Sequence, residues 1–243
     1  MLGLTLTGNH LTIMEIKQLS LIEGAKQAQG LAVIIDVFRA FSVAAYAFAR
    51  GASEIVLIGD AQQAFELRKT RFPDALLVGE IGGRHIEGFD FGNSPTHIAE
   101  SLVDFSGRRL IQRTSAGTQG VVNALGADEI VLGSFLCAGA ITAHILARKP
   151  ATVSIVGMGD SGAAKTDEDE SLSELLAARL RGETPDGQAA LKRARDGQAG
   201  QRFADNTPDA PSTDVHYCLQ LDKFDFVLTV AREDGLLVAR KGR

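Results

Sequence analysis

Residues 31–36 read Leu-Ala-Val-Ile-Ile-Asp, five apolar residues that end abruptly at a carboxylate. An all-apolar run of this length predicts a strand buried on both faces, as in a parallel sheet covered by helices. Asp36 then lies where the buried strand opens into a loop, and open α/β sheets bind ligands at that end of their strands. This stretch therefore predicts the layout of the fold and one position of its site.

Outward from residues 31–36, short aliphatic runs alternate with helical stretches along most of the chain. This alternation predicts a three-layer α/β/α fold with a largely parallel sheet. The further strands that we expect are residues 54–58, 75–78, 109–112, 129–132 and 152–156, and the expected helices are residues 41–50, 61–71, 97–105, 117–125 and 135–148.

The last third of the chain has a different pattern. It begins with a charged segment rich in Ala and Arg, which predicts helices over residues 171–181 and 187–194, followed by a surface loop up to residue 213. Apolar segments 224–230 and 236–239 then predict a closing C-terminal β-hairpin. With a length of 243 residues, we expect one domain over residues 1–243.

One short motif occurs twice. Residues 51–57 read Gly-Ala-Ser-Glu-Ile-Val-Leu, and residues 126–132 read Gly-Ala-Asp-Glu-Ile-Val-Leu. Duplication of a β-loop-α-β unit would divide the chain into halves 31–105 and 106–243, with both loops at carboxyl ends of strands in one sheet. A common helix-to-strand joint explains the same match, so both interpretations stay open.

The composition indicates a globular protein and argues against a nucleic-acid-binding or membrane-spanning protein. Hydrophobic residues make up 45% of the chain and charged residues 23%, as in an ordinary globular protein. The net charge of −5 argues against a nucleic-acid partner, and no apolar run is long enough to span a membrane. The two cysteines, Cys137 and Cys218, lie in apolar surroundings, so we expect reduced thiols and a cytoplasmic protein. The oligomeric state stays open, with a homodimer as one expectation.

Residues 88–95, Gly-Phe-Asp-Phe-Gly-Asn-Ser-Pro, combine features of a phosphate site. Ser94 as N-cap and Pro95 in the first turn predict a helix start, whose free N–H groups and dipole can receive an anion. Asp90, upstream of that start, is the type of group that binds a hard cation. An anion site beside a cation ligand suggests phosphate chemistry with a divalent metal.

Asp36 and Arg39 form a second candidate group. Asp36 could bind Mg²⁺ or act as a nucleophile, and it could equally cap the following helix. Arg39 lies between Phe38 and Ala40, where a guanidinium needs an anionic partner. A phosphate or carboxylate ligand would serve, and so would a structural salt bridge.

Two further loops carry polar groups. Glu80 follows a predicted strand and precedes two glycines and Arg84, so it could bind a metal or pair with a neighbouring arginine. Residues 113–118 read Arg-Thr-Ser-Ala-Gly-Thr at a strand-to-helix junction, which could wrap a phosphate or cap a helix. Within the acidic run 167–170, we expect most side chains to be solvated and one to point inward, Asp169 first and Glu168 next.

These motifs, in order, resemble the 2-phosphosulfolactate phosphatase family. The matching pieces are Asp36 to Ala40, Gly79-Glu80, Ile86 to Pro95, Thr114 to Thr118, Gly133-Ser134-Phe135 and Glu168-Asp169. The resemblance implies a three-layer α/β fold and Mg²⁺-dependent hydrolysis of 2-phospho-3-sulfolactate to sulfolactate and phosphate. The chain departs from the family pattern at Ala116 and Cys137, where Asn is usual, and in the loop before Glu168, which is about one residue longer.

We therefore hypothesise a Mg²⁺ site and an anion clamp at one edge of the sheet. The metal ligands are expected to be Asp36, Glu80, Asp90 and Asp169, and the catalytic residues Asp36, Arg39 and Arg113. The residues expected to bind the substrate or its phosphate are Arg84, Asn93, Ser94, Thr114, Ser115, Gly117, Thr118 and Ser134.

Two other functions fit the sequence as well. The first is a phosphatase for another small phosphorylated hydroxy acid or sugar acid, which a panel of phosphorylated acids would separate from the main hypothesis. The second is a non-catalytic protein that binds a phosphorylated metabolite, which predicts stabilisation by the ligand without phosphate release. Several carboxylates near the anion site favour an enzyme.

Overall fold

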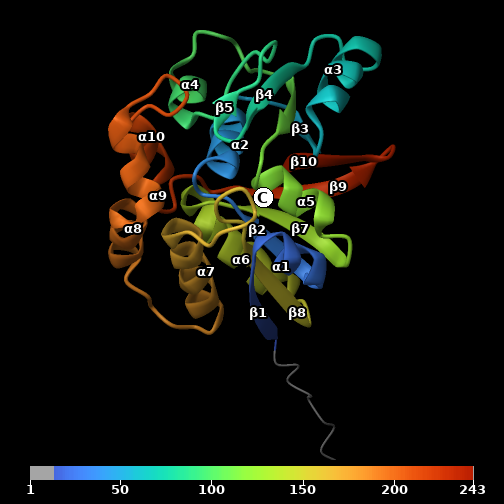
Figure 1. The fold of residues 1–243 in the computed structure, drawn as a ribbon. Helices are drawn as coiled ribbons and strands as arrows, with labels where there is room; N and C mark the ends of the chain where they lie inside the picture. Colours follow the sequence, from blue (N-terminus) through green and yellow to red (C-terminus); the bar gives the residue numbers. More distant parts are fainter. Residues whose placement is uncertain (1–13, 243) are drawn as a thin grey trace, which may run out of the picture.

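The computed structural model describes residues 14–242, which form one mixed ten-stranded sheet flanked by helices (Figure 1). The strand order is β1-β8-β2-β7-β9-β10-β3-β6-β4-β5. The strands are β1 (Glu15–Ser20), β2 (Gly30–Ile35), β3 (Glu54–Ile58), β4 (Leu76–Ile81), β5 (Arg84–His85), β6 (Arg109–Arg113), β7 (Ala127–Gly133), β8 (Thr152–Gly157), β9 (Val227–Glu233) and β10 (Leu236–Gly242).

Helices connect the strands and cover both faces of the sheet. They are α1 (Leu21–Gln27), α2 (Ala40–Ala49), α3 (Ala61–Thr70), α4 (Pro95–Glu100), α5 (Gly117–Asn123), α6 (Ala138–Arg148), α7 (Asp167–Leu180), α8 (Gly187–Asp196), α9 (Gln198–Gln201) and α10 (Thr213–Cys218), with 3-10 turns η1 (Phe135–Cys137) and η2 (Arg202–Asp205). None of the helices within residues 14–242 has the length and apolar character needed to cross a membrane.

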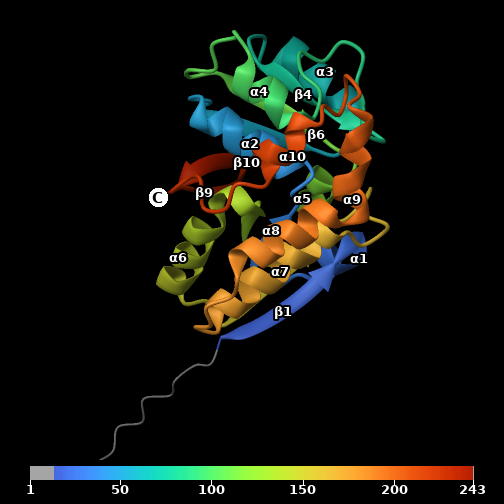
Figure 2. The ribbon, with the colours of Figure 1, turned by 90° about the vertical axis from the view of Figure 1, so that its left-hand side faces the viewer.

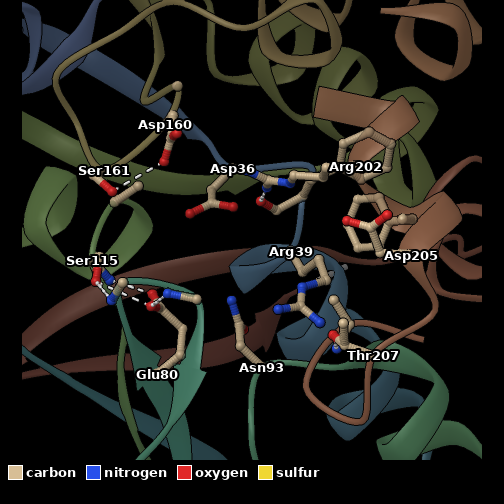
Figure 3. Close-up of a pocket in the computed structure, with 17 residues that line it drawn as sticks. Asp36, Arg39, Glu80, Asn93, Ser115, Asp160, Ser161, Arg202, Asp205 and Thr207 are labelled. Atoms are coloured by element: carbon tan, nitrogen blue, oxygen red, sulfur yellow. Dashed lines mark hydrogen bonds between the residues drawn. The ribbon is translucent and has the colours of Figure 1, made fainter. Parts of the chain in front are cut away.

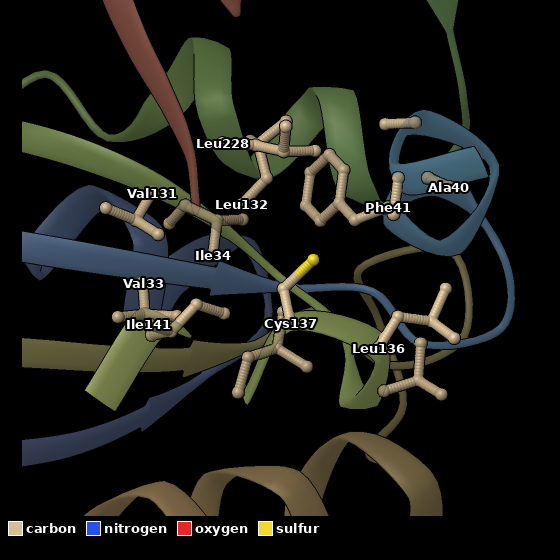
Figure 4. Close-up of a cluster of buried hydrophobic side chains, with 14 of the residues drawn as sticks. Val33, Ile34, Ala40, Phe41, Val131, Leu132, Leu136, Cys137, Ile141 and Leu228 are labelled. Carbon is tan, nitrogen blue, oxygen red and sulfur yellow. The ribbon is translucent and has the colours of Figure 1, made fainter. Parts of the chain in front are cut away.

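The buried strand β2 lies at the centre of the larger parallel group. Val33 is in register with Val131 of β7 and Ile155 of β8, and all three side chains are fully buried. Helices α1 and α5 cover the face that carries Ile34, and α6 and α7 cover the opposite face (Figure 4). The predicted three-layer α/β fold is confirmed, and it follows from a strand that is apolar on both sides.

The C-terminal hairpin was predicted, but its position in the sheet was not. Strands β9 and β10 pair with each other and lie between two parallel groups, β1-β8-β2-β7 and β3-β6-β4. All three junctions across this hairpin are antiparallel, from β7 to β9, β9 to β10 and β10 to β3. The two parallel groups therefore run in opposite directions, and the hairpin joins them in the middle of the sheet.

The opposed groups direct their strand ends toward a common space. Asp36 and Gly159 follow β2 and β8 of one group, whereas Glu80 lies near the end of β4 and Ser115 follows β6 of the other. All four residues line one cavity. The strands of the predicted halves 31–105 and 106–243 alternate in the sheet, since β2 lies between β8 and β7 and β6 lies between β3 and β4.

Three of the differences from the prediction affect the surroundings of the cavity. The helix that starts at Pro95 ends at Glu100 and does not continue to residue 105. Helix α7 begins at Asp167, so the acidic run forms its first turn, where carboxylates suit the helix dipole. The predicted surface loop before residue 213 contains α9 and η2. Helix α9 packs against α7 and α8 (Figure 2), and residues of η2 line the cavity.

Candidate active site

A cavity of about 450 Å³ lies where the two parallel groups face each other. Its wall combines carboxylates, two arginines, an amide and hydroxyl groups (Figure 3). The lining residues that carry such groups are Asp36, Arg39, Glu80, Asn93, Ser115, Asp160, Ser161, Arg202, Asp205 and Thr207.

Asp36 is fixed at the cavity by the first N–H groups of two helices, α2 and α5. Its Oδ1 accepts a hydrogen bond from the Ala40 N–H at 3.0 Å, and its Oδ2 accepts one from the Gly117 N–H at 2.7 Å. Burial raises the pKa of Asp36 to about 6, the two N–H donors oppose that rise, and the charge of nearby Glu80 adds to it. The N-cap residue of α2 is Arg39 and not Asp36, but the Asp36 carboxylate accepts from the first N–H of that helix and also faces the cavity.

Glu80 is the second buried carboxylate of the cavity and is only 5% exposed. Its Oε1 accepts a hydrogen bond from the Ser115 N–H at 2.5 Å, and its Oε2 accepts from the Gly83 N–H at 2.6 Å. The Ser115 hydroxyl also donates to Oε2 at 3.1 Å. The loops after β4 and β6 thus orient Glu80 toward Asp36 across the cavity.

Arg39 is buried, 5% exposed, and faces the cavity from the start of α2. Its Nη1 donates to Asp214 Oδ2 at 2.7 Å and to the Asp209 carbonyl at 2.5 Å. Asp214 is fully buried and also accepts from the Ser94 hydroxyl at 2.6 Å and from the Thr96 N–H at 3.1 Å. A structural salt bridge therefore orients the guanidinium, while its Nε and Nη2 make no hydrogen bond within residues 14–242.

Asn93 is the one residue of the motif 88–95 that lines the cavity. It is 6% exposed, and its Oδ1 is buried without a hydrogen-bond partner among the described residues. Because buried polar atoms are normally satisfied, this amide is suited to a ligand in the cavity. Ser94 caps α4 by accepting from the His97 N–H at 3.2 Å and does not line the cavity.

The sequence did not indicate Arg202 or Asp214. Arg202 lines the cavity from η2, and its positive charge lowers the pKa of both Asp36 and Glu168, against the larger effect of burial. Arg202 lies far along the chain from Asp36, and Asp214 lies 175 positions from Arg39, in segments whose composition resembles a solvated surface. An arginine beside Phe203 was the available signal for Arg202, similar to the one that singled out Arg39.

Within the acidic run, Glu168 and Asp169 are both buried, at 2% exposure each. Asp169 accepts from the Val37 N–H at 2.9 Å and the Gly159 N–H at 2.8 Å, so it fixes two loops that border the cavity. Burial raises the pKa of Asp169 well above its usual range and that of Glu168 to about 7. Glu168 Oε2 is buried and has no hydrogen-bond partner among the described residues.

The turn 113–118 serves the cavity mainly through its backbone. Arg113 donates to the carbonyls of Glu80 at 2.7 Å and Gly59 at 3.3 Å, and its side chain does not line the cavity. Thr114 and Thr118 bond to each other and are fully buried. Gly117 contributes its N–H to Asp36 and has no room for a side chain.

The structure places three other predicted residues away from the cavity. Asp90 accepts from the Leu77 N–H at 2.7 Å and forms a salt bridge with Arg68 at 2.9 Å. Arg84 is exposed on the short strand β5, and Ser134 is the buried N-cap of η1. Asp90 therefore does not join Asp36 and Glu80.

The two residues at which the chain departs from the family pattern, Ala116 and Cys137, differ in their position. Ala116 lines the cavity, so the absence of an Asn there changes its wall. Cys137 lies in the apolar core near Phe41 and Ile141 (Figure 4), so that substitution does not face the cavity. Both cysteines are free and buried, as expected.

The donor set is compatible with Mg²⁺ at Asp36 and Glu80. No group of three or more His, Cys, Asp or Glu within residues 14–242 is arranged as a metal site. Mg²⁺ commonly needs only one or two carboxylates, because waters and substrate phosphates complete its coordination. Both carboxylates keep free lone pairs after their N–H contacts, and a cation between them would relieve their repulsion.

Carboxylates and arginines that face one cavity suit an enzyme that acts on a small phosphorylated compound, because the arginines can stabilise charge on the phosphoryl oxygens. A sequence model of the 2-phosphosulpholactate phosphatase family matches residues 17–233. The chain belongs to this family and is therefore a phosphoric monoester hydrolase.

Curated relatives resemble the chain over most of their length. A probable 2-phosphosulfolactate phosphatase of Bacillus subtilis (strain 168) is 35% identical over 208 residues, which cover 84% of this chain and 87% of the relative. Another of the same name from Deinococcus radiodurans is 32% identical over 218 residues, which cover 85% of this chain and 90% of the relative.

Proposed function

We propose that this enzyme hydrolyses 2-phospho-3-sulfolactate to 3-sulfolactate and inorganic phosphate, and that the reaction depends on Mg²⁺. One observation carries the proposal: the buried guanidinium of Arg39 faces the same 450 Å³ cavity as the carboxylates of Asp36 and Glu80. The family and the names of the relatives supply the substrate.

Arg39 is suited to bind the phosphoryl group. Because Asp214 and the Asp209 carbonyl engage only Nη1, the donors on Nε and Nη2 remain for oxygens in the cavity. A guanidinium with two adjacent free donors matches a phosphate in a bidentate manner. The buried salt bridge fixes this geometry before the substrate arrives, so charge that develops on the phosphoryl oxygens meets an oriented donor.

Asp36 and Glu80 are the residues that would bind Mg²⁺. When bound there, the metal would neutralise phosphoryl charge and polarise the phosphorus–oxygen bond. The chain supports these carboxylates with N–H donors from Ala40, Gly117, Ser115 and Gly83, which keep both side chains aimed into the cavity. The amide of Asn93 adds an uncharged hydrogen-bonding group that discriminates the orientation of the substrate.

Phosphate release from a panel of phosphorylated acids tests the proposal. We expect 2-phospho-3-sulfolactate to give the highest kcat/KM, EDTA to abolish turnover, and added Mg²⁺ to restore it. A preferred substrate without a sulfonate would overturn the assigned substrate, and full activity after EDTA treatment would overturn the metal. Thermal stabilisation by the substrate without any phosphate release would identify a binding protein.

A further inference from the structure

Two arginines line the cavity, and they differ in how their charge is balanced. Arg39 is 5% exposed and paired with Asp214 at 2.7 Å. Arg202 is exposed and forms no salt bridge within residues 14–242, and its one hydrogen bond there runs from Nη2 to the Phe38 carbonyl at 3.4 Å. The charge of Arg202 is thus available to an anion in the cavity.

Both guanidinium groups lie against the same aromatic ring. The Cζ atoms of Arg39 and Arg202 are 5.6 and 5.5 Å from the ring centroid of Phe203. Phe203 is 1% exposed and packs edge-on against Phe38, with 5.1 Å between the ring centroids. The two cations therefore lie around one buried ring. Both arginines line the same cavity (Figure 3), so one small ligand there can contact both.

The different anchoring of the two arginines suggests different tasks. The group that reacts needs a donor with fixed geometry, which the buried and doubly anchored Arg39 supplies. A second acidic group, remote from the reacting atoms, needs charge and reach but less exact placement. Arg202, on the solvent side of Phe203, has these properties.

We propose that Arg202 binds the second acidic group of a phosphorylated acid, its carboxylate or sulfonate, while Arg39 binds the phosphoryl group. This inference rests on the proposed function and assigns the part of the site that selects the acid. An ester that has a phosphate and no further acid would then leave Arg202 unused.

The kinetic test compares two substrates in Arg202→Ala. We expect the ratio of kcat/KM for 2-phospho-3-sulfolactate to that for propan-2-yl phosphate to fall about 10- to 100-fold, mainly through KM for the acid. Arg202→Lys should recover part of this ratio because it keeps the charge. Arg195→Ala, at another exposed arginine outside the cavity, is the control and should leave the ratio unchanged.

Two further substrates identify the acidic group that Arg202 contacts. 2-Phospholactate keeps only the carboxylate, and the phosphate ester of 2-hydroxyethanesulfonate keeps only the sulfonate. The substrate whose kcat/KM falls in Arg202→Ala contains the contacted group. An equal fall for all four substrates, propan-2-yl phosphate included, would place Arg202 at the phosphoryl group and overturn the inference.

A binding experiment separates this inference from the proposed reaction. Calorimetry with 3-sulfolactate and with inorganic phosphate needs no turnover. We expect Arg202→Ala to weaken the binding of 3-sulfolactate about 10-fold or more relative to the binding of phosphate. Wild-type protein that fails to bind 3-sulfolactate overturns the inference. Arg202-dependent binding in a protein that releases no phosphate would instead uphold it and reject the proposed function.

Discussion

Two segments border the cavity, and each begins with a charged residue. The first loop is residues 36–39, between β2 and α2, and the second loop is residues 113–118, from the last residue of β6 into the first turn of α5. In the first loop, the charged side chains of Asp36 and Arg39 face the cavity. In the second loop, Arg113 turns toward backbone carbonyls, and the N–H groups of Ser115 and Gly117 bind the carboxylates of Glu80 and Asp36.

This difference shows that two loops that border the same cavity can contribute in different ways, one through side chains and the other through backbone N–H groups. The first loop can present a buried arginine because Asp214, from a distant helix, balances the charge. In the second loop, Arg113 donates to the carbonyls of Gly59 and Glu80. These hydrogen bonds stabilise the turn, and the N–H groups of the turn orient the carboxylates. The first loop presents charged side chains to the cavity, and the second loop orients the carboxylates with its N–H groups.

The largest effect is expected from Asp36→Asn. The variant keeps the size of the side chain but removes the charge opposite Glu80 and one acceptor for the N–H groups of Ala40 and Gly117. We expect kcat/KM for phosphate release to fall on the order of 1,000-fold, as when other preorganised charged groups are removed. Steady-state kinetics on the folded variant measure this loss.

Asp90→Asn is the matched control for that experiment. Asp90 was expected to bind the metal, but its carboxylate pairs with Arg68 and caps the Leu77 N–H outside the cavity. Because a partly exposed ion pair contributes little, we expect activity close to that of the wild type and a stability loss of about 1 kcal/mol or less. A loss as large as that of Asp36→Asn would show that Asp90 joins the site.

Arg39→Ala is expected to lower stability by about 3 kcal/mol or more, besides abolishing most activity. Removal of the guanidinium leaves Asp214, which is fully buried, with an unbalanced charge. Urea unfolding measures the loss. Adding Asp214→Asn to Arg39→Ala should restore part of the stability, because the amide can still accept from Ser94 and Thr96. Additive losses would show that the pair is not coupled.

Much of the fold follows from local patterns in the sequence. The apolar run 31–35 identified β2, and the other aliphatic runs identified β3, β4, β6, β7 and β8. The direction of the second parallel group was not predictable, because it depends on a hairpin that inserts at the centre of the sheet from the end of the chain. Pairing between strands so distant in sequence leaves no local signal.

The site was predictable where a charge interrupts an apolar segment. Asp36, Arg39 and Glu80 are such exceptions, and all three line the cavity. Asp214 and Arg202 lie in polar segments, where a charged residue is unremarkable, so only the tertiary structure identifies them. Arg113 looks equivalent to Arg39 in sequence, and the orientation of its side chain depends on the carbonyls of Gly59 and Glu80.

Gly117→Ala tests the support that the second loop gives to the first. A Cβ atom at this position would lie 2.8 Å from Asp36 Oδ2 and 2.8 Å from the Ala40 Cβ, which requires a shift of both. We expect a stability loss of about 2 kcal/mol and a fall in kcat as Asp36 moves. In the control Gly92→Ala, the added Cβ meets only the His85 Cβ at 3.8 Å, so little change is expected. Unchanged kcat in Gly117→Ala would contradict the supporting role.

Arg113→Ala is expected to have the smallest effect and tests the contrast between the loops most directly. The variant loses hydrogen bonds to neutral carbonyls and to the Ser115 hydroxyl, and no buried carboxylate is left unpaired. We therefore expect a stability loss of about 1 kcal/mol, similar to that of Arg108→Ala, whose side chain donates to the Asp74 carbonyl at 2.8 Å. Activity should fall far less than in Arg39→Ala, because Glu80 keeps its contacts with the Ser115 and Gly83 N–H groups. If Arg113→Ala abolished turnover while Arg108→Ala did not, Arg113 would have to reach the phosphoryl group, and both loops would supply reacting side chains.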